Sequence, residues 1–252
     1  MPERFPEVAL APGTLFVADL HLDVEDGAAV ERFLGFLERA GGAPRVVVLG
    51  DLFEYWLGPP HQRTDGGQRL VDALAARARR GVLFDVVPGN RDFLLDAGFE
   101  RAAGARVHRH GFVGVLPDGG RVLFVHGDEL ATLDVAYQRL RRVLRSRPLL
   151  WLAPRLPLTV SRGLARRLRR ASTGAVARKP PEEKSLQPAA AAALLRATGA
   201  AALVCGHAHE FRDERPEDAG RWMVLDAFGG TRDLLRVGAA GELAVEATRA
   251  LG

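Results

Sequence analysis

Short apolar runs that end in polar residues recur along the chain. Five of them, quoted with the polar residues that follow, are TLFVADLH, RVVVLGD, VLFDVVPGN, RVLFVHGD and AALVCGHAH. Apolar runs of this length, bounded by Gly and polar residues, are typical of strands that are buried on both faces. The pattern therefore predicts five buried strands.

Two segments between these runs have helical spacing. Val30, Phe33 and Leu37 recur at intervals of three or four residues, and the segment Gln68–Arg80 has the same amphipathic pattern. Strands that alternate with amphipathic helices predict an α/β fold.

Polar side chains follow all five predicted strands. In α/β sheets, ligands bind beyond the carboxyl ends of the strands. We therefore expect one site built from five segments by Asp19, His21, Asp51, Asn90, His126, His207 and His209. Carboxylate, amide and imidazole donors without a thiolate suit Mn²⁺, Mg²⁺ or Fe²⁺ and also accept Zn²⁺.

Composition limits the class of protein. The chain has 252 residues, 47% of them hydrophobic, which is enough for a large core, either in a single domain over residues 1–252 or in two domains. The one cysteine, Cys205, cannot form an intrachain disulfide, and MPERFPEVAL lacks the apolar run of a signal peptide. No stretch reaches the roughly 18 apolar residues of a membrane-spanning helix. We expect a cytoplasmic location.

The charge is unevenly distributed. Residues 135–181 contain 13 Lys and Arg and no Asp or Glu, although the formal net charge of the whole chain is only +4. A basic segment on an acidic body favours an anionic partner: lipid, nucleic acid or a phosphorylated ligand. The alternative is a solvated helix face with no partner.

In this order, the motifs resemble those of the calcineurin-like metallophosphoesterases over nearly the whole chain. The resemblance implies a β-sandwich flanked by helices, with a dinuclear metal site at one edge. It also implies the ligands: Asp19, His21 and His209 for one metal, Asn90, His126 and His207 for the other, and Asp51 between them. Two such metals generate a nucleophile from water and stabilise charge on a phosphoryl oxygen, so the expected reaction is phosphoester or phosphoanhydride hydrolysis.

The residue after Asn90 bears on which bond is cut. Many relatives have a His there as a candidate acid, whereas this chain has Arg91. Arginine does not release its proton, but it can hold an anionic oxygen with two hydrogen bonds. A phosphate leaving group departs without a proton donor, which favours a pyrophosphate substrate. Asp51, Asn90, Arg91 and His126 are the expected catalytic residues.

More narrowly, ADLHL, GDLFEYW, GNRDF and HGDELATLDVAYQ are similar to motifs of the UDP-2,3-diacylglucosamine pyrophosphohydrolases of lipid A biosynthesis. That resemblance implies hydrolysis to UMP and 2,3-diacylglucosamine 1-phosphate, usually with Mn²⁺. It also implies a peripheral protein on the cytoplasmic face of the inner membrane of a Gram-negative bacterium.

The same resemblance implies an inserted helical cap at residues 131–186. A first helix carries the apolar stripe Leu133, Tyr137, Leu140 and Leu144, with most arginines off it; Pro148, Pro154 and Pro157 separate it from a second helix near residues 161–170. Apolar faces for acyl chains and arginines for lipid phosphates suit a peripheral enzyme. Leu149, Leu150 and Trp151 are candidates for acyl contact or bilayer insertion, or for burial in the protein's own core. Nucleic acid is the weakest candidate partner, since only Trp151 and Tyr137 could stack on bases.

Substrate contacts are expected from Asn90, Arg91, Asp134, Ser172, Lys184 and His207. The chain departs from the relatives' pattern at Glu210 and Phe211 and at the Asp226–Gly230 turn, which leaves open another nucleotide diphosphate or phosphodiester as substrate. A non-catalytic module that binds anionic lipid or nucleic acid is the other alternative. We expect His61, His108 and His110 to be structural or exposed, Asp92 and Asp128 to orient neighbouring groups, and Cys205 to pack in the core.

Overall fold

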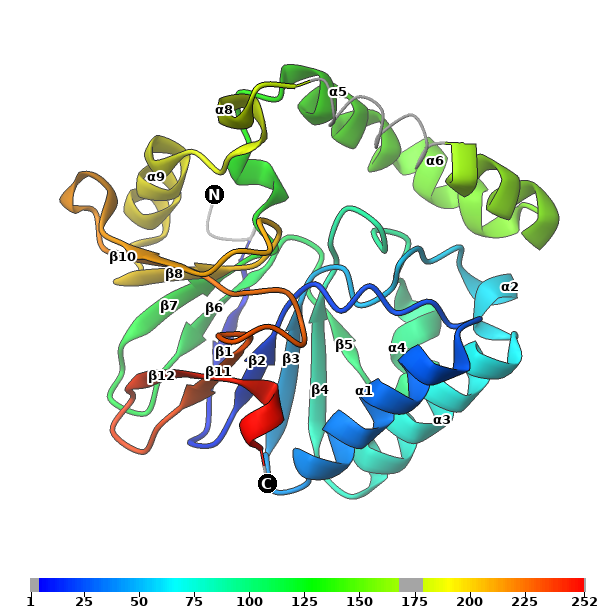
Figure 1. Ribbon diagram of the computed structural model, residues 1–252, viewed down its shortest axis with the longest axis horizontal. Coiled ribbons are helices and arrows are strands. Elements are labelled where there is room, and N and C mark those ends of the chain that lie inside the picture. Colours follow the sequence, from blue (N-terminus) through cyan, green and yellow to red (C-terminus); the bar gives the residue numbers. More distant parts are fainter. Residues whose placement is uncertain (1–4, 168–178, 252) are drawn as a thin grey trace.

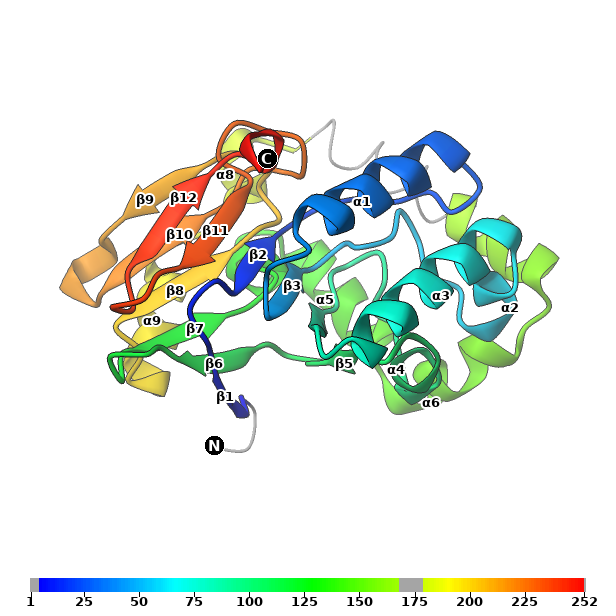
Figure 2. The same ribbon diagram turned by 90° about the horizontal axis from the view of Figure 1, so that it is seen from below.

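The computed structural model describes residues 5–167 and 179–251, with the side chains of Pro181 and Lys184 left out of the description. Two six-stranded sheets form a sandwich (Figures 1 and 2). The first sheet has the order β1-β6-β7-β8-β10-β9, and the second has the order β12-β11-β2-β3-β4-β5. The strands are β1 (Glu7–Ala9), β2 (Leu15–Val17), β3 (Arg45–Leu49), β4 (Leu83–Val87), β5 (Arg106–Val107), β6 (Phe112–Val115), β7 (Arg121–Phe124), β8 (Ala202–Cys205), β9 (Arg212–Glu214), β10 (Arg221–Val224), β11 (Leu234–Val237) and β12 (Leu243–Glu246).

Parallel pairing brings the carboxyl ends of the predicted strands to one edge. β2, β3, β4 and β5 run parallel in one sheet, and β7 and β8 run parallel in the other. The five strands expected from the apolar runs are β2, β3, β4, β7 and β8, so that prediction is confirmed.

Side chains from both sheets fill the space between them. The rings of Phe16 and Phe124 stack at a centroid distance of 4.2 Å, and Phe112 packs against Phe124 at 5.2 Å. Val47 of the second sheet and Val204 of the first are fully buried in the same cluster. This apolar layer holds the two sheets together and therefore fixes their shared edge.

Helices cover both outer faces of the sandwich (Figure 1). The second sheet is covered by α1 (Gly27–Arg39), α3 (Asp65–Arg79) and α4 (Ala97–Ala103), and the first by α9 (Pro188–Thr198). Side-chain oxygens of Asp26 and Thr64 accept hydrogen bonds from the first turns of α1 and α3. The two predicted helices and the sandwich flanked by helices are confirmed.

Within residues 131–186, the described parts 131–167 and 179–186 leave the sandwich as a helical arm that crosses the upper ends of the strands in Figure 1. It contains α5 (Val135–Leu144), α6 (Arg147–Leu152), η3 (Ala153–Arg155), a helical stretch over residues 158–167, and α8 (Pro181–Lys184). The sequence predicts that Pro148, Pro154 and Pro157 separate two helices, and in the structure α6 and η3 occupy this interval. Pro148 lies in the first turn of α6, where its missing N–H costs no helical hydrogen bond.

The remaining short helices are α2 (Pro59–Gln62), η2 (Asp128–Leu130), η4 (Pro216–Asp218) and η5 (Thr248–Ala250). None of the helices that the described residues form is long and apolar enough to cross a membrane.

Candidate metal centre

Seven polar side chains converge at the shared edge of the two sheets. In chain order they are Asp19 and His21 after β2, Asp51 after β3, Asn90 after β4, His126 after β7, and His207 and His209 after β8. The sequence predicted that these segments would meet, and the structure brings all of them together.

One group of donor atoms lies around Asp19. Donor atoms of Asp19, His21 and His209 lie within 4.8 Å of one another. The Nε2 atoms of His21 and His209 are 3.0 Å apart, and His209 Nε2 lies 3.6 Å from Asp19 Oδ1. This is the trio that the resemblance assigned to the first metal.

A second group lies around His126. Its Nε2 atom is 3.2 Å from Asn90 Oδ1 and 3.2 Å from His207 Nδ1. Asp51 lies between the two groups, with Oδ2 3.9 Å from His126 Nε2 and 3.8 Å from His21 Nδ1. The arrangement matches a pair of cations that share the Asp51 carboxylate.

The backbone at the centre is in an unusual conformation. Five of the seven residues have left-handed φ angles: Asp19 (53°), His21 (48°), Asp51 (48°), His207 (71°) and His209 (56°). Each such conformation costs on the order of 1 kcal/mol for a residue with a Cβ atom. Strain of this kind concentrates at functional sites, where it fixes the direction of the side chains.

Glycines allow the strand ends to approach the neighbouring ligands. A Cβ atom on Gly50 would lie 1.9 Å from His126 Nδ1, and one on Gly206 would lie 2.4 Å from Asp19 Oδ2. A Cβ atom on Gly89 would lie 2.1 Å from Asp51 Oδ1. The Gly in each of the GD, GN and GH pairs therefore makes room for a donor from another strand. The sequence contained this signal, but read alone each pair looked like an ordinary turn.

Two of the imidazoles are neutral near pH 7. Burial, with the positive charge of Arg91, lowers the pKa of His21 to about 3. Burial, with the neighbouring His126, lowers the pKa of His207 to about 4. Neutral imidazole is the form that binds a metal, because one ring nitrogen then has a free lone pair.

The donor set fits divalent cations. Within the described ranges, Asp19 Oδ1 and His21 Nδ1 are buried and have no hydrogen-bond partner. Buried polar atoms are rarely left unpaired, and facing imidazole nitrogens at 3.0 Å need a proton or a cation between them. Asp19, His21, Asp51, Asn90, His126, His207 and His209 would hold the metals.

Arg91 lies at the border of the centre. Its backbone N–H donates to Asp51 Oδ1 at 2.9 Å, and its guanidinium pairs with Glu54 at 2.5 Å. The guanidinium Nε also lies 3.5 Å from Asp51 Oδ2. Glu54, which sequence reasoning did not single out, thus holds the Arg91 side chain beside the ligands.

An apolar pocket of about 230 Å³ opens next to Asn90 and Arg91. The sandwich contributes Trp56 and Phe93 to its wall. The helical arm supplies the opposite wall with Tyr137, Leu140, Leu144, Leu149, Leu156 and Leu164. The predicted apolar stripe thus faces this pocket from Tyr137 onward, whereas Leu133 is exposed.

Three residues of the predicted acyl or membrane contact have different surroundings. Leu149 lines the pocket, Leu150 packs against the core of the sandwich, and Trp151 is 61% exposed. Packing in the protein's own core therefore holds for Leu150, and acyl contact or bilayer insertion stays a prediction for Leu149 and Trp151.

The expected substrate contacts in the arm are only partly described. Asp134 is buried, accepts the Tyr137 N–H at 2.9 Å and pairs with Lys179 at 2.5 Å. Ser172 lies outside the described residues, as does the side chain of Lys184.

Two arginines of the arm point inward. Arg141 and Arg145 contact the buried carboxylate of Asp128, although the sequence had suggested lipid phosphates for arginines of this helix. Burial alone would raise the pKa of Asp128, but Arg145, His126 and Arg141 hold that pKa well below its usual value. Tyr137, Arg141 and Arg145 are four residues apart on one helix face, a spacing that could have revealed a shared partner.

The other polar residues outside the cluster have structural surroundings. Asp92 is buried and accepts hydrogen bonds from the backbone of Gly89 and Phe53, as expected of an orienting residue. His61 and His108 are buried and His110 is exposed, so the first two have the structural and the third the surface position that the sequence left open. Cys205 is fully buried in the core, as predicted.

The two departures from the relatives' pattern contact each other. Asp226 accepts the backbone N–H of Phe211 at 2.8 Å, and the Arg232 guanidinium stacks on the Phe211 ring at 4.8 Å. Phe211 and the Asp226–Gly230 turn therefore lie side by side.

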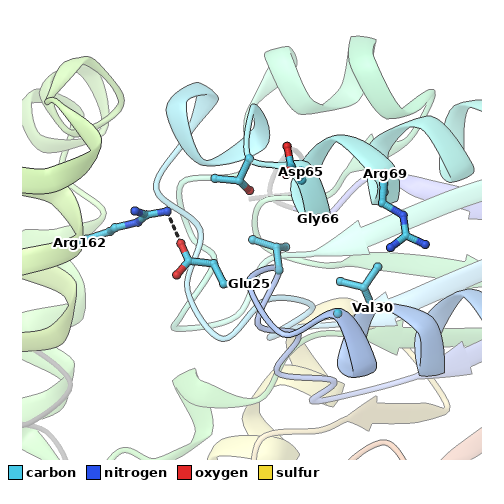
Figure 3. A pocket seen from close by; sticks show the side chains of 9 residues that line it. Glu25, Val30, Asp65, Gly66, Arg69 and Arg162 are labelled. Atoms are coloured by element: carbon cyan, nitrogen blue, oxygen red, sulfur yellow. Dashed lines mark hydrogen bonds and ion pairs between the residues drawn. The ribbon is translucent and has the colours of Figure 1, made fainter.

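An open hollow of about 490 Å³ lies between the starts of α1 and α3 and the helical stretch 158–167 (Figure 3). Arg162 reaches across it from the arm and pairs with Glu25. The ion pair joins the arm to the sandwich on the side away from α5.

Comparisons with known proteins identify the family of this chain. A family model described as calcineurin-like phosphoesterase matches residues 14–211. A UDP-2,3-diacylglucosamine hydrolase from Azotobacter vinelandii is 41% identical over 197 residues, covering 78% of this chain and 81% of that protein. Another from Aeromonas salmonicida is 41% identical over 202 residues, covering 78% and 77%. The structure of a dimetal phosphatase from Danio rerio aligns with a TM-score of 0.44 at 14% identity, covering 94% of this chain and 97% of that one.

The family model spans most of the chain, and the two relatives are similar to it over three quarters of their length or more. This chain therefore belongs to the calcineurin-like phosphoesterase family, in the group of the UDP-2,3-diacylglucosamine hydrolases, and is a metal-dependent hydrolase.

Proposed function

We propose that this protein hydrolyses the pyrophosphate bond of UDP-2,3-diacylglucosamine to UMP and 2,3-diacylglucosamine 1-phosphate. The observation that carries the proposal is the direct opening of an apolar pocket onto Asn90 and Arg91, beside the cluster of seven donors. A substrate with a charged diphosphate and two acyl chains needs both features side by side. The name of the relatives supports the same substrate.

We assign the seven donors to two metal ions, with Mn²⁺ as the first candidate and Mg²⁺, Fe²⁺ or Zn²⁺ as alternatives. When bound, such ions activate water and stabilise negative charge on a phosphoryl oxygen. Asp19, His21 and His209 form one site, Asn90, His126 and His207 form the other, and the Asp51 carboxylate lies between the two groups.

Arg91 would bind the diphosphate. Its guanidinium is held by Glu54 and keeps its proton, so it neutralises oxygen charge and does not act as an acid. A sugar phosphate leaves without being protonated, whereas an alkoxide would need a donor. Arg91 therefore favours phosphoanhydride cleavage over cleavage of an alkyl phosphodiester. Asn90 and His207, together with Asp134, Ser172 and Lys184 of the arm, remain candidates for further substrate contacts.

The helical arm at residues 131–186 would act as a cap within one metallophosphoesterase domain. The pocket beneath it accepts acyl chains, because its wall is formed mainly by Leu, Trp and Phe side chains.

The outer face of the cap would dock on an anionic membrane, the cytoplasmic face of the inner membrane. Trp151, Leu152 and Val160 are about half exposed or more, and Arg155 stacks on the Trp151 ring at 4.2 Å. Apolar side chains with adjacent arginines bind the boundary between headgroups and acyl chains.

Trp151→Ala should weaken binding to phosphatidylglycerol vesicles several-fold, measured by co-sedimentation. Binding of both proteins to neutral vesicles should be weak.

The activity is tested by measuring UMP release from UDP-2,3-diacylglucosamine, other nucleotide diphosphates and an aryl phosphodiester, each with and without Mn²⁺. We expect strong preference for the first substrate, dependence on Mn²⁺, and no release by Asp51→Ala. Equal rates on all substrates would contradict the assigned substrate, and activity of Asp51→Ala would contradict the shared carboxylate. Anion binding that is unaffected by metal removal, with no hydrolysis, would indicate a binding module.

A further inference from the structure

One buried carboxylate joins the cap to the metal centre. Asp128 is fully buried, two residues after His126, and its Oδ2 atom accepts three hydrogen bonds from α5. The donors are Tyr137 Oη at 2.7 Å, Arg141 Nε at 2.6 Å and Arg145 Nη2 at 3.3 Å. We call these four residues the Asp128 network.

Arg145 connects this network to a second ligand segment. Its Nη2 atom also donates to the backbone carbonyl of Gly89 at 2.9 Å, directly before Asn90. One guanidinium thus bridges the segment that carries His126 and the segment that carries Asn90, which come from different sheets.

The network extends to a third segment. The Tyr137 ring lies parallel to the His207 ring, with an interplanar angle of 28° and a centroid distance of 6.5 Å. Gln138 of the same helix donates to the Asp128 and Ala131 carbonyls at 2.8 and 3.1 Å. α5 therefore contacts the backbone or side chains of all three segments that supply Asn90, His126 and His207.

Neither β-sheet ladder provides this connection. Asn90 and His126 lie beyond the ends of β4 and β7, so strand pairing does not fix their distance of 3.2 Å. A charge-assisted hydrogen bond across the gap is short, directional and strong when it is buried.

We propose that Asp128 and Arg145 are positioning residues that set the relative placement of Asn90 and His126, so that helix α5 is a structural part of the catalytic centre as well as a lipid-binding element. The inference rests on the proposed metal-dependent function, but not on the identity of the lipid substrate. It assigns the arm a role that neither acyl binding nor membrane docking requires.

Arg145→Met tests the proposal, since Met keeps most of the length of the side chain and removes the bridge. We expect about a tenfold or greater loss of kcat on both UDP-2,3-diacylglucosamine and a soluble aryl phosphodiester, with KM changed little. We also expect Mn²⁺ affinity, measured by titration calorimetry, to fall by about tenfold or more. Arg145→Lys keeps the charge but lacks the planar guanidinium that bonds to both Asp128 and Gly89. Its kcat and Mn²⁺ affinity should lie between those of Arg145→Met and wild type.

Arg221→Met is the matched control. Arg221 makes a two-point ion pair with Asp213 on β9 and β10, away from the centre, so this variant loses the same charge and a comparable pair. Its kcat and Mn²⁺ affinity should equal those of wild type.

Other outcomes decide against the proposal. If folded Arg145→Met keeps kcat within twofold of wild type and binds Mn²⁺ equally well, the network is merely structural. If Arg145→Met does not fold, Arg145→Lys decides, because it keeps the charge and cannot reach both Asp128 and Gly89 in the same way; Mn²⁺ affinity and kcat equal to wild type in that variant would overturn the proposal. If the wild type binds Mn²⁺ but does not cleave the lipid, the substrate assignment fails, and the Mn²⁺ titrations still decide on the network.

Discussion

At the scale of single residues, the metal centre depends on positions where a side chain is missing. Gly50, Gly89 and Gly206 bring strand ends against His126, Asp51 and Asp19, respectively. Five of the seven donor residues themselves adopt left-handed backbone conformations that favour glycine. The centre is therefore fixed as much by backbone geometry as by the identity of the donors.

Gly206→Ala should disable the centre without removing a donor. The new methyl group would lie 2.4 Å from Asp19 Oδ2, which accepts the His207 N–H at 2.7 Å, so Asp19 has to move. We expect kcat and Mn²⁺ affinity to fall by about tenfold or more, measured by UMP release and calorimetry. Gly42→Ala, where a Cβ atom meets nothing within 4 Å, is the control. Wild-type Mn²⁺ affinity in Gly206→Ala would show that the contact is not restrictive.

His61 should make stability depend on pH. Its ring is buried against Tyr55 and Trp56, and burial, with the charge of Arg162, lowers its pKa to about 4. The folded protein therefore binds a proton at His61 less readily than the unfolded chain, whose His has a pKa of about 6.5. Stability from this residue is complete above pH 6.5 and is lost as the pH falls toward 4.

The measurement is urea unfolding at pH 7 and pH 5 of wild type and His61→Phe, both with EDTA. Between pH 7 and pH 5, the free energy of unfolding should fall by about 1–2 kcal/mol more in wild type than in His61→Phe. Equal losses would mean that His61 titrates normally in the folded protein.

At the scale of elements, two of the polar contacts between the arm and the sandwich differ in burial. α5 is joined to the sandwich through the buried Asp128, whereas the helical stretch 158–167 is joined at the open hollow by the partly exposed Arg162–Glu25 pair. Leu164 of that stretch lines the apolar pocket. We therefore expect the Arg162–Glu25 pair to affect the position of one wall of the pocket and not that of the metal centre.

Breaking the Arg162–Glu25 pair by charge reversal should change the KM for the lipid substrate alone. A partly exposed pair contributes up to about 1 kcal/mol, so Arg162→Glu should raise KM for UDP-2,3-diacylglucosamine by up to about fivefold. The KM for an aryl phosphodiester should stay the same, and adding Glu25→Arg should restore the first KM. Reversing the nearby exposed Arg69–Glu31 pair is the control. A double reversal that fails to restore KM would rule out the pairing as the cause.

At the scale of the whole molecule, the two assigned metal sites would join the two sheets. Ligands come from strands of both, and the two assigned sites each draw on both sheets. Metal binding should therefore stabilise the sandwich as a unit, because the unfolded chain cannot gather these donors.

Adding Mn²⁺ at about 100 times its Kd to EDTA-treated protein should stabilise it by about 2.7 kcal/mol for each site. For a domain of this size, each site should therefore raise the Tm by about 5–10 °C, measured by calorimetry. Asp51→Asn should show a much smaller rise, since it lacks the shared carboxylate. An equal rise in both proteins would place the Mn²⁺ elsewhere.

The sequence by itself determined five of the strands, two of the main helices and the set of seven donors. Each of these depends on local pattern: apolar runs form buried strands, and polar residues follow where the strands end. The sequence also showed the basic segment, but only as an excess of positive charge. It did not show which way each arginine side chain points.

Only the tertiary structure decided which arginines face inward, which glycines touch a donor and where the apolar stripe points. Arg145 contacts Gly89 and Asp128, residues 56 and 17 positions away, and no local pattern encodes such a contact. His61 is buried against Tyr55 and Trp56, although its neighbours in sequence suggested a loop. Side-chain direction and burial depend on what the fold brings opposite each residue, and the chain establishes that only when the two sheets and the arm come together.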